Sequence, residues 1–202
     1  MRIAPIREDN VYGGLRLAIP AFIGSARLSV QVDIGFGDAI TPAPMMVTYP
    51  TLLDDLAAPS LRAYPVYTVI AEKLHAMVVL GMNNSRMKDF FDLAVIARTT
   101  ELDGRTLVGA ICATFARRNT TLPASTPAAL TTEFSSNPIK ARHWRAFVTK
   151  AGLQWTSLED VVDLLAVFLN PVIAACSRSR GFELNWNPSA REWVVGSGTS
   201  ER

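Results

Sequence analysis

Arg27-Leu-Ser-Val-Gln-Val-Asp-Ile34 alternates polar and apolar residues without interruption. A β-strand places two such sets on opposite faces of a sheet, so this segment predicts a strand. Leu15-Arg-Leu-Ala-Ile19 alternates more weakly, and Gly24-Ser25 between the two segments supplies a turn. The pattern predicts a hairpin, with Met45–Tyr49 as one more short strand.

Helical patterns dominate the sequence after a Pro- and Asp-marked connection that runs from Pro50 to Pro65. The turn residues Asn83-Asn84-Ser85 separate the first two helices and supply an N-cap for the second. Pro171 is predicted to end the last helix, because it cannot donate the next helical N–H. The predicted helices are 66–81, 85–98, 104–118, 139–151 and 157–169.

Strands followed by helices predict an α+β fold. We expect residues 1–65 to form a small sheet and residues 66–195 to form a helical domain. The residues from Gly196 onward are expected to fray.

Composition narrows the class of protein. The chain has 202 residues, of which 49% are apolar and 19% charged, and its net charge is +2. This suits a globular protein with a core, and any basic patch must be local. The first residues lack a signal-peptide core, and the longest apolar run, Val66–Met82, is interrupted by charges. We therefore expect a cytoplasmic protein with no membrane partner.

Three further features carry little functional weight. Cys112 and Cys176 lie far apart with no metal-ligand spacing, which favours buried free thiols over a disulfide or a zinc site. His143 beside Trp144 is interpreted as a residue at the edge of the core. Glu101-x-Asp103 matches a two-carboxylate metal motif in letters only, because it lies between two predicted helices.

Asp33 is the first candidate for a functional residue. It lies on the polar face of the regular strand and is followed by Gly35-Phe-Gly-Asp38. A carboxylate at the end of a strand, beside glycines that let other groups approach, suits a ligand of a divalent cation. The alternative is a solvated residue on a half-exposed sheet.

Glu72, Lys73 and His75 interrupt the first helix, which is otherwise apolar nearly all round. Burying a lysine without a partner is costly, so Lys73 must face a cleft or an acidic side chain. In a cleft it would neutralise phosphate charge. The alternative is a Lys–Asp pair that holds two helices together.

Ser85-Arg-Met-Lys-Asp-Phe-Phe-Asp-Leu93 crowds four charges onto the start of the second helix. Arg86 is three residues from Asp89, and Lys88 is four residues from Asp92, so both pairs share a face. Exposed pairs of this kind usually contribute little. The polar helix just before them makes a shared cleft the competing interpretation.

Taken together, these segments resemble the nucleotidyltransferase AbiEii/AbiGii toxin family. One family motif is an apolar helix with Glu-Lys and then Ala, as in Val69-Ile-Ala-Glu-Lys-Leu-His-Ala76. The next, Ser-x-Arg-x-x-Lys-Asp-x-x-Asp-Leu, is matched by 85–93 with one or two residues fewer around the arginine. The strand 30–38, Tyr49-Pro50 and Arg62-Ala-Tyr-Pro65 add to the likeness, which runs from about Pro5 to Pro171.

The resemblance implies a partial polymerase-β-like nucleotidyltransferase sheet and a helical bundle. Relatives of this kind transfer a nucleotidyl group from a nucleoside triphosphate (NTP) to RNA such as tRNA, using Mg²⁺ and in-line chemistry. An antitoxin protein is a possible partner. The roles implied for individual residues are Mg²⁺ binding by Asp33, nucleotide binding by Lys73, Arg86 and Lys88, catalytic roles for Lys73, Asp89 and Lys88, and support from Glu72, Ser85 and Asp92.

One family feature is missing from the sequence. The family places two metal-binding carboxylates, Asp-x-Asp, on a strand after a glycine turn, upstream of the segments above. Gly13-Gly14 is the only glycine pair here, and no suitable acidic pair follows it. We therefore expect little or no catalysis by this chain alone. The alternative function is a non-catalytic remnant that binds RNA or an antitoxin.

Overall fold

The computed structural model describes residues 1–6, 13–154, 156–178 and 181–196. The chain forms two compact units, Met1–Ala39 and Ile40–Arg202. It combines antiparallel sheets with helices, strands first, which confirms the predicted α+β class. The residues expected to fray lie outside the described ones, apart from Gly196.

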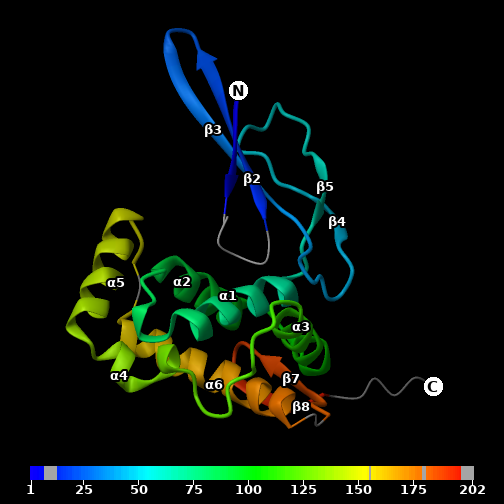
Figure 1. Ribbon diagram of the computed structural model, residues 1–202, viewed down its shortest axis with the longest axis vertical. Coiled ribbons are helices and arrows are strands. Elements are labelled where there is room, and N and C mark those ends of the chain that lie inside the picture. Colours follow the sequence, from blue (N-terminus) through cyan, green and yellow to red (C-terminus); the bar gives the residue numbers. More distant parts are fainter. Residues whose placement is uncertain (7–12, 155, 179–180, 197–202) are drawn as a thin grey trace. The chain divides into compact units, whose positions relative to one another are not determined.

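The first unit is the antiparallel sheet β1-β2-β3, formed by Arg2–Ile6, Gly14–Ile23 and Ala26–Gly35 (Figure 1). Ile23 pairs with Ala26 across the two-residue turn at Gly24-Ser25, and Gly24 has a φ of 58° that suits glycine. The predicted hairpin is therefore confirmed. The apolar side chains of β3 lie on the same face of the sheet as those of β2. The apolar side chains of β3 are exposed.

The second unit begins with the two-stranded sheet β4-β5, Met45–Thr48 and Ser60–Ala63. β4 matches the predicted short strand, whereas β5 falls in the segment we interpreted as a connection. Its helices are α1 (Val66–Leu80), η1 (Gly81–Asn83), α2 (Met87–Thr99), α3 (Gly104–Arg117), η2 (Ala128–Leu130), α4 (Thr132–Ser135), α5 (Pro138–Lys150) and α6 (Leu158–Ser177).

Local capping explains where several of these helices begin. Asp103 accepts a hydrogen bond from the backbone N–H of Thr106 at the start of α3. Asn137 caps α5 and precedes Pro138, whose fixed φ suits the first helical position. Ser157 and Asp160 form a reciprocal capping box at the start of α6. Asp103 thus serves as a cap, and it lies on the short strand β6 rather than merely between two helices.

Helix α6 runs through the core and continues past the predicted end at Pro171. The expectation that Pro171 stops the helix was wrong. The missing N–H removes the bond to the carbonyl of Val167, a residue on the exposed face of the helix. The opposite face continues with buried Val172, Ile173 and Cys176, and this packing carries the helix onward.

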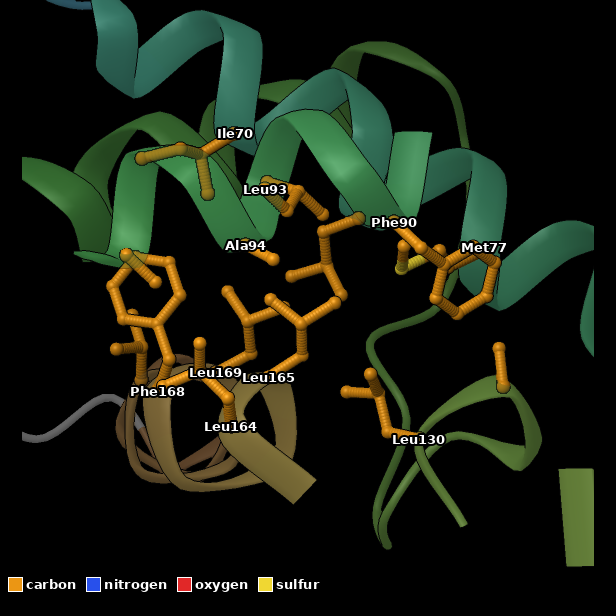
Figure 2. Packing of buried hydrophobic residues seen from close by; sticks show 14 of the residues in the cluster. Ile70, Met77, Phe90, Leu93, Ala94, Leu130, Leu164, Leu165, Phe168 and Leu169 are labelled. Carbon is orange, nitrogen blue, oxygen red and sulfur yellow. The ribbon is translucent and has the colours of Figure 1, made fainter. Parts of the chain in front are cut away.

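Apolar side chains from α1, α2, α3, α4 and α6 form one core. Figure 2 shows Leu93 and Ala94 of α2 facing Leu165 and Leu169 of α6. By length and mean hydropathy, 1.7, α6 is the one described helix that could cross a membrane. However, 56% of that segment is buried inside the protein, as in an ordinary core helix, so it gives only weak support for a membrane span.

A third sheet, β6-β7-β8, was not predicted. It consists of Leu102–Asp103, Leu184–Asn187 and Glu192–Val195. Buried Trp186 donates its indole N–H to the carbonyl of Ala97 at 2.7 Å, and its ring packs on Phe168 of α6. Gly104 permits the close approach of α3 to this sheet, since a Cβ there would overlap the carbonyl of Leu184.

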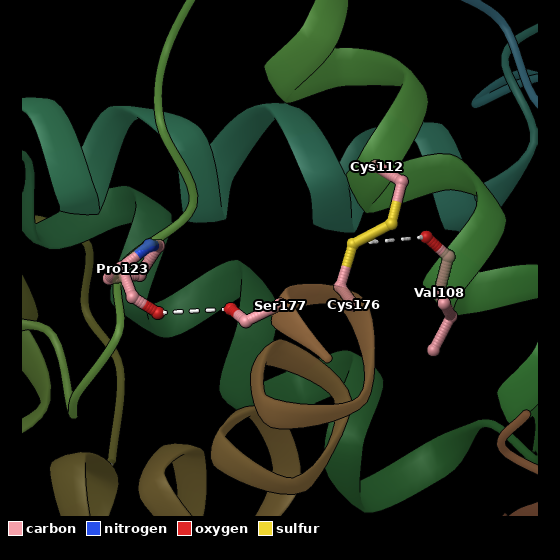
Figure 3. Close-up of a disulfide and its surroundings, with 5 residues drawn as sticks. All are labelled: Val108, Cys112, Pro123, Cys176 and Ser177. Atoms are coloured by element: carbon pink, nitrogen blue, oxygen red, sulfur yellow. Dashed lines mark hydrogen bonds between the residues drawn. A yellow bond between two sulfur atoms is a disulfide. The ribbon is translucent and has the colours of Figure 1, made fainter. Parts of the chain in front are cut away.

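Cys112 of α3 and Cys176 of α6 form a disulfide (Figure 3). The expectation of free thiols was therefore wrong. Helices α3 and α6 pack together and place the two Cα atoms 6.1 Å apart, within the range that a disulfide spans. Sequence spacing does not report this distance, because 64 residues separate the two cysteines.

Candidate functional site

Lys73 of α1 lies between two carboxylates of α2. Its Nζ donates to Asp89 Oδ1 at 2.8 Å and to Asp92 Oδ2 at 2.7 Å. The lysine side chain is 18% exposed and that of Asp89 is 6% exposed, so the pair is largely shielded from water. Of the two settings that the sequence allowed for Lys73, the structure has the acidic partner.

Two exposed cations complete this group. Arg86 Nε lies 2.9 Å from Asp89 Oδ2, close enough for an ion pair but not aligned for a hydrogen bond. Lys88 Nζ donates to Asp92 Oδ2 at 2.7 Å. The side chains of Arg86 and Lys88 are 57% and 73% exposed. We call the five residues Lys73, Arg86, Lys88, Asp89 and Asp92 the Lys–Asp cluster.

Lys73 and Asp92 hold each other ionised. Burial lowers the pKa of Lys73, but its hydrogen bonds to Asp89 and Asp92 outweigh burial and raise this pKa overall. Burial likewise raises the pKa of Asp92, and hydrogen bonds from Lys73 and Lys88 outweigh it, so the pKa of this carboxyl is lowered. Three cations and two carboxylates give the cluster one excess positive charge.

Glu72 and His75 face a different helix from Lys73. Glu72 forms an ion pair with Arg118, which follows α3. His75 Nε2 lies 2.8 Å from the hydroxyl of Thr120, and its ring packs edge-on against Phe115. Glu72 thus links α1 to the end of α3, and the adjacent Lys73 links α1 to α2. Glu72 therefore supports the position of α1.

His75 makes the stability of the protein depend on pH. Burial, together with the charge of Arg118, lowers the pKa of His75 to about 4 from 6.5. The folded protein therefore favours neutral His75, and this stabilisation is present above pH 6.5 and is lost as the pH falls toward 4. We expect His75→Gln to flatten the rise in unfolding free energy over this range, as measured by urea unfolding. An unchanged slope would contradict the assignment.

The start of α2 differs from its prediction. The helix begins at Met87 with Arg86 as its N-cap, two residues later than expected. Asn84 Oδ1 accepts a hydrogen bond from the backbone N–H of Arg86, which closes a turn before the helix. Ser85 is exposed and does not cap the helix; within the described ranges, α2 has no side-chain cap.

A pocket of about 410 Å³ lies beside this helix start. Ser85, Arg86 and Lys88 line one side of it, and His143 and Phe147 of α5 line the other. His143 Nδ1 is buried and has no hydrogen-bond partner in the part of the chain that the structure describes. His143 is next to buried Trp144, as predicted, but its place in the pocket was not foreseen.

Asp33 belongs to the other unit. Both of its oxygens accept hydrogen bonds from Arg16 on the neighbouring strand, at 2.7 and 2.8 Å. Arg16 is its direct cross-strand partner, and both side chains are more than 40% exposed. Among the described residues, no group of three or more His, Cys, Asp or Glu side chains could hold a metal ion. This donor set does not fit a two-cation site.

Sequence reasoning missed one residue that positions this site. Lys140 of α5 is buried, donates to the carbonyl of Asn84 at 2.7 Å, and lies over the ring of Phe134. Burial lowers the pKa of Lys140. This contact ties α5 to the turn that precedes α2. The only sequence signal was a lysine at a core-facing helical position, which does not name its partner.

A family model matches residues 2–164, more than three-quarters of the chain. Its description is nucleotidyl transferase AbiEii toxin, type IV toxin–antitoxin system. The chain belongs to this AbiEii family. No curated protein and no solved structure matches the chain. The match confirms the family resemblance of the sequence motifs.

The AbiEii match covers the first unit from Arg2 onward, the second unit as far as Leu164, and the whole Lys–Asp cluster. It ends inside α6, so β7 and β8 lie beyond it. Strand β6 and the pocket beside α2 lie within the matched region.

Proposed function

We propose that this AbiEii protein acts as the toxin of a type IV toxin–antitoxin or abortive-infection system. In its complete form it transfers a nucleotidyl group from an NTP to an RNA acceptor. The net charge of the chain is only +2, so the RNA is bound by a local basic site. The proposed acceptor is a tRNA and the proposed compartment is the cytoplasm. The proposed protein partner is an antitoxin. The observation that carries this proposal is the Lys–Asp cluster beside the pocket.

The exposed cations of the cluster are the proposed triphosphate contacts. Arg86 and Lys88 reach solvent, and their partners Asp89 and Asp92 are shared with Lys73. An arriving triphosphate competes with these carboxylates for the two cations, because phosphate oxygens accept the same charge-assisted bonds. Lys73 stays on Asp89 and Asp92 and keeps both helices in place while this exchange occurs.

The remaining assignments follow the geometry of the pocket. The Ser85 hydroxyl lies at its wall, where it is placed to bond a phosphate oxygen or an acceptor group. Lys88 and Asp89 are the proposed catalytic residues, one of which orients the acceptor or the triphosphate. Lys73 positions them through its hydrogen bonds to Asp89 and Asp92. Neutralising phosphate charge is the main contribution that such residues make to phosphoryl-group transfer.

Mg²⁺ is proposed for the complete enzyme, where it would neutralise phosphate charge. Asp33 is the residue of this chain that would hold the ion, which would take the place of Arg16 as the partner of the carboxylate. Exposed ion pairs contribute only about 0–1 kcal/mol, so this exchange is inexpensive. One carboxylate does not make a two-cation site, and we propose that the 202 residues alone transfer little or no nucleotide.

Residues 1–65 are the proposed remnant of the nucleotidyltransferase sheet, and residues 66–195 are the proposed helical domain.

A non-catalytic role is the second candidate. The observation that favours it is that the best candidate groups are already engaged, Lys73 with two carboxylates and Asp33 with Arg16. Such a protein would bind RNA or an antitoxin through the helical unit without transferring anything.

Transfer of labelled nucleotide from each NTP to total tRNA, with Mg²⁺, distinguishes the two candidates. The 202-residue chain is compared with an N-terminally extended version that carries a glycine turn and an Asp-x-Asp strand. We expect labelling by the extended version only. Labelling by neither version supports the binding role, and labelling by both contradicts our assignment of the metal site.

A further inference from the structure

Helix α5 carries several positively charged side chains, although the net charge of the whole chain is only +2. Its 13 residues include Lys140, Arg142, His143, Arg145 and Lys150, and no Asp or Glu. Lys140 is buried, whereas the side chains of Arg142, Arg145 and Lys150 are exposed. Within the described ranges no carboxylate pairs with these three. We call Arg142, Arg145 and Lys150 the α5 basic face.

The α5 basic face is fixed next to the pocket beside α2. Lys140 ties the first turn of α5 to the carbonyl of Asn84, and the ring of Phe147 lies 5.8 Å from that of Phe91 in α2. His143 projects from the same helix into the pocket wall. A ligand lying along α5 is therefore led to the exposed side chains of Arg86 and Lys88.

Two features of the pocket favour an anionic ligand. His143 Nδ1 is buried without a hydrogen-bond partner among the described residues. The first turn of α2 has no side-chain cap there, and the N-terminus of a helix carries a partial positive charge. These features favour a phosphate group at the point where the α5 basic face meets α2.

The dimensions of α5 suit a nucleic-acid strand. Arg142 to Lys150 spans about 12 Å at the rise of an α-helix. A strand of a duplex carries one phosphate charge per about 3.4 Å, so the three cations face several consecutive phosphates. A membrane-surface helix would instead expose its apolar side. Here Trp144 is buried and Phe147 packs against α2, leaving Ile139 as the one large exposed apolar residue of α5.

We propose that the α5 basic face binds the phosphate backbone of the RNA acceptor and guides it into the pocket formed by Ser85, Arg86, Lys88 and His143. This inference rests on the proposed transferase function, because it assigns the acceptor-binding surface of that same site. It adds a helix that the sequence motifs do not include.

The test measures binding of fluorescein-labelled total tRNA to the 202-residue chain, without NTP or Mg²⁺, over a range of salt concentrations. The variant Arg142→Ala/Arg145→Ala/Lys150→Ala is compared with a control of equal charge loss, Arg62→Ala/Arg105→Ala/Arg178→Ala. Removing three phosphate contacts should weaken binding about 100-fold at 0.15 M salt and reduce the magnitude of the slope of log K against log salt by about 2–3. The control should stay within about threefold of the wild type.

Equal tRNA affinity in the α5 variant and the wild type would overturn the proposal, as would an equal loss in the control. Binding of anionic phosphatidylglycerol vesicles in place of tRNA would also overturn it. As a second measurement, p-benzoylphenylalanine at exposed Ala146 of α5 should cross-link to tRNA, and the same group at Val167 of α6 should not. Cross-linking only from Val167 would contradict the assigned surface.

The two proposals fail in different ways. If tRNA binds through α5 but the complete enzyme transfers no nucleotide, the proposed function is wrong and the RNA-binding surface stands. If transfer occurs and the α5 variant binds tRNA as the wild type does, the surface is wrong and the function stands.

Discussion

Lys73→Met should lower the free energy of unfolding by about 3 kcal/mol at pH 7, as measured by urea unfolding. Methionine keeps the length of the side chain but removes its charge. Asp89, which is only 6% exposed, then keeps a poorly aligned contact with Arg86 and loses its direct hydrogen bond. Removing one partner of a buried ion pair typically costs about 3–5 kcal/mol, and the residual exposure of Lys73 places this case at the lower end.

Lys88→Met provides the matched control. Lys88 donates to the same Asp92 oxygen, but its side chain is 73% exposed. We expect a loss below about 0.5 kcal/mol, as for other exposed ion pairs. Equal and small losses in the two variants would contradict the structural role of Lys73. They would instead favour a role for Lys73 in binding phosphate.

The effect of Lys73→Met should depend on pH with a defined sign. The lowered pKa of Asp92 stabilises the folded state above its ordinary value of 3.8, and this contribution disappears as the pH falls through the lowered pKa. The raised pKa of Lys73 stabilises the folded state below 10.5, and this contribution is lost as the pH rises through the raised pKa. The difference in unfolding free energy between the wild type and Lys73→Met is therefore largest between pH 3.8 and pH 10.5.

Trp186→Ala should cost about 4 kcal/mol, the largest loss that we expect from a single substitution. The indole is 1% exposed, packs on Phe168 and Trp193, and donates its N–H to Ala97. Truncating a buried aromatic residue leaves a cavity and typically costs about 3–5 kcal/mol. Thermal unfolding followed by circular dichroism measures the loss.

Trp186→Phe separates the two contributions of this residue. It retains an aromatic ring but leaves the carbonyl of Ala97 without the indole donor, so we expect a loss of about 1–2 kcal/mol. A Trp186→Ala protein as stable as the wild type would show that the sheet β6-β7-β8 does not dock on α2 and α6.

The elements with a regular period were predictable from the sequence. The alternation in 27–34 predicted β3 and its partner strand, and all five predicted helices begin within two residues of their predicted positions. Pairing residues by their spacing also anticipated the contacts of Arg86 with Asp89 and of Lys88 with Asp92. These features depend on neighbours that are close in the chain.

The missed features depend on contacts between distant segments. β7 has only four residues, and its stability comes from Trp186 inserted beside Ala97 and Phe168. The continuation of α6 past Pro171 depends on the buried face of that helix. The pocket brings His143 to residues more than 50 positions earlier in the chain. No local pattern encodes these distances, so sequence periodicity could not reveal them.

The most direct test of the account is NTP binding to the 202-residue chain by equilibrium dialysis with labelled nucleotides. The exposed cations of the Lys–Asp cluster, Arg86 and Lys88, are the proposed contacts of the triphosphate. We expect Arg86→Ala/Lys88→Ala to weaken binding about 100-fold, since charge-assisted hydrogen bonds contribute about 1.5–3 kcal/mol each. The charge-matched control Arg105→Ala/Arg178→Ala should bind as the wild type does. Equal affinity in the cluster variant and the control would contradict the claim.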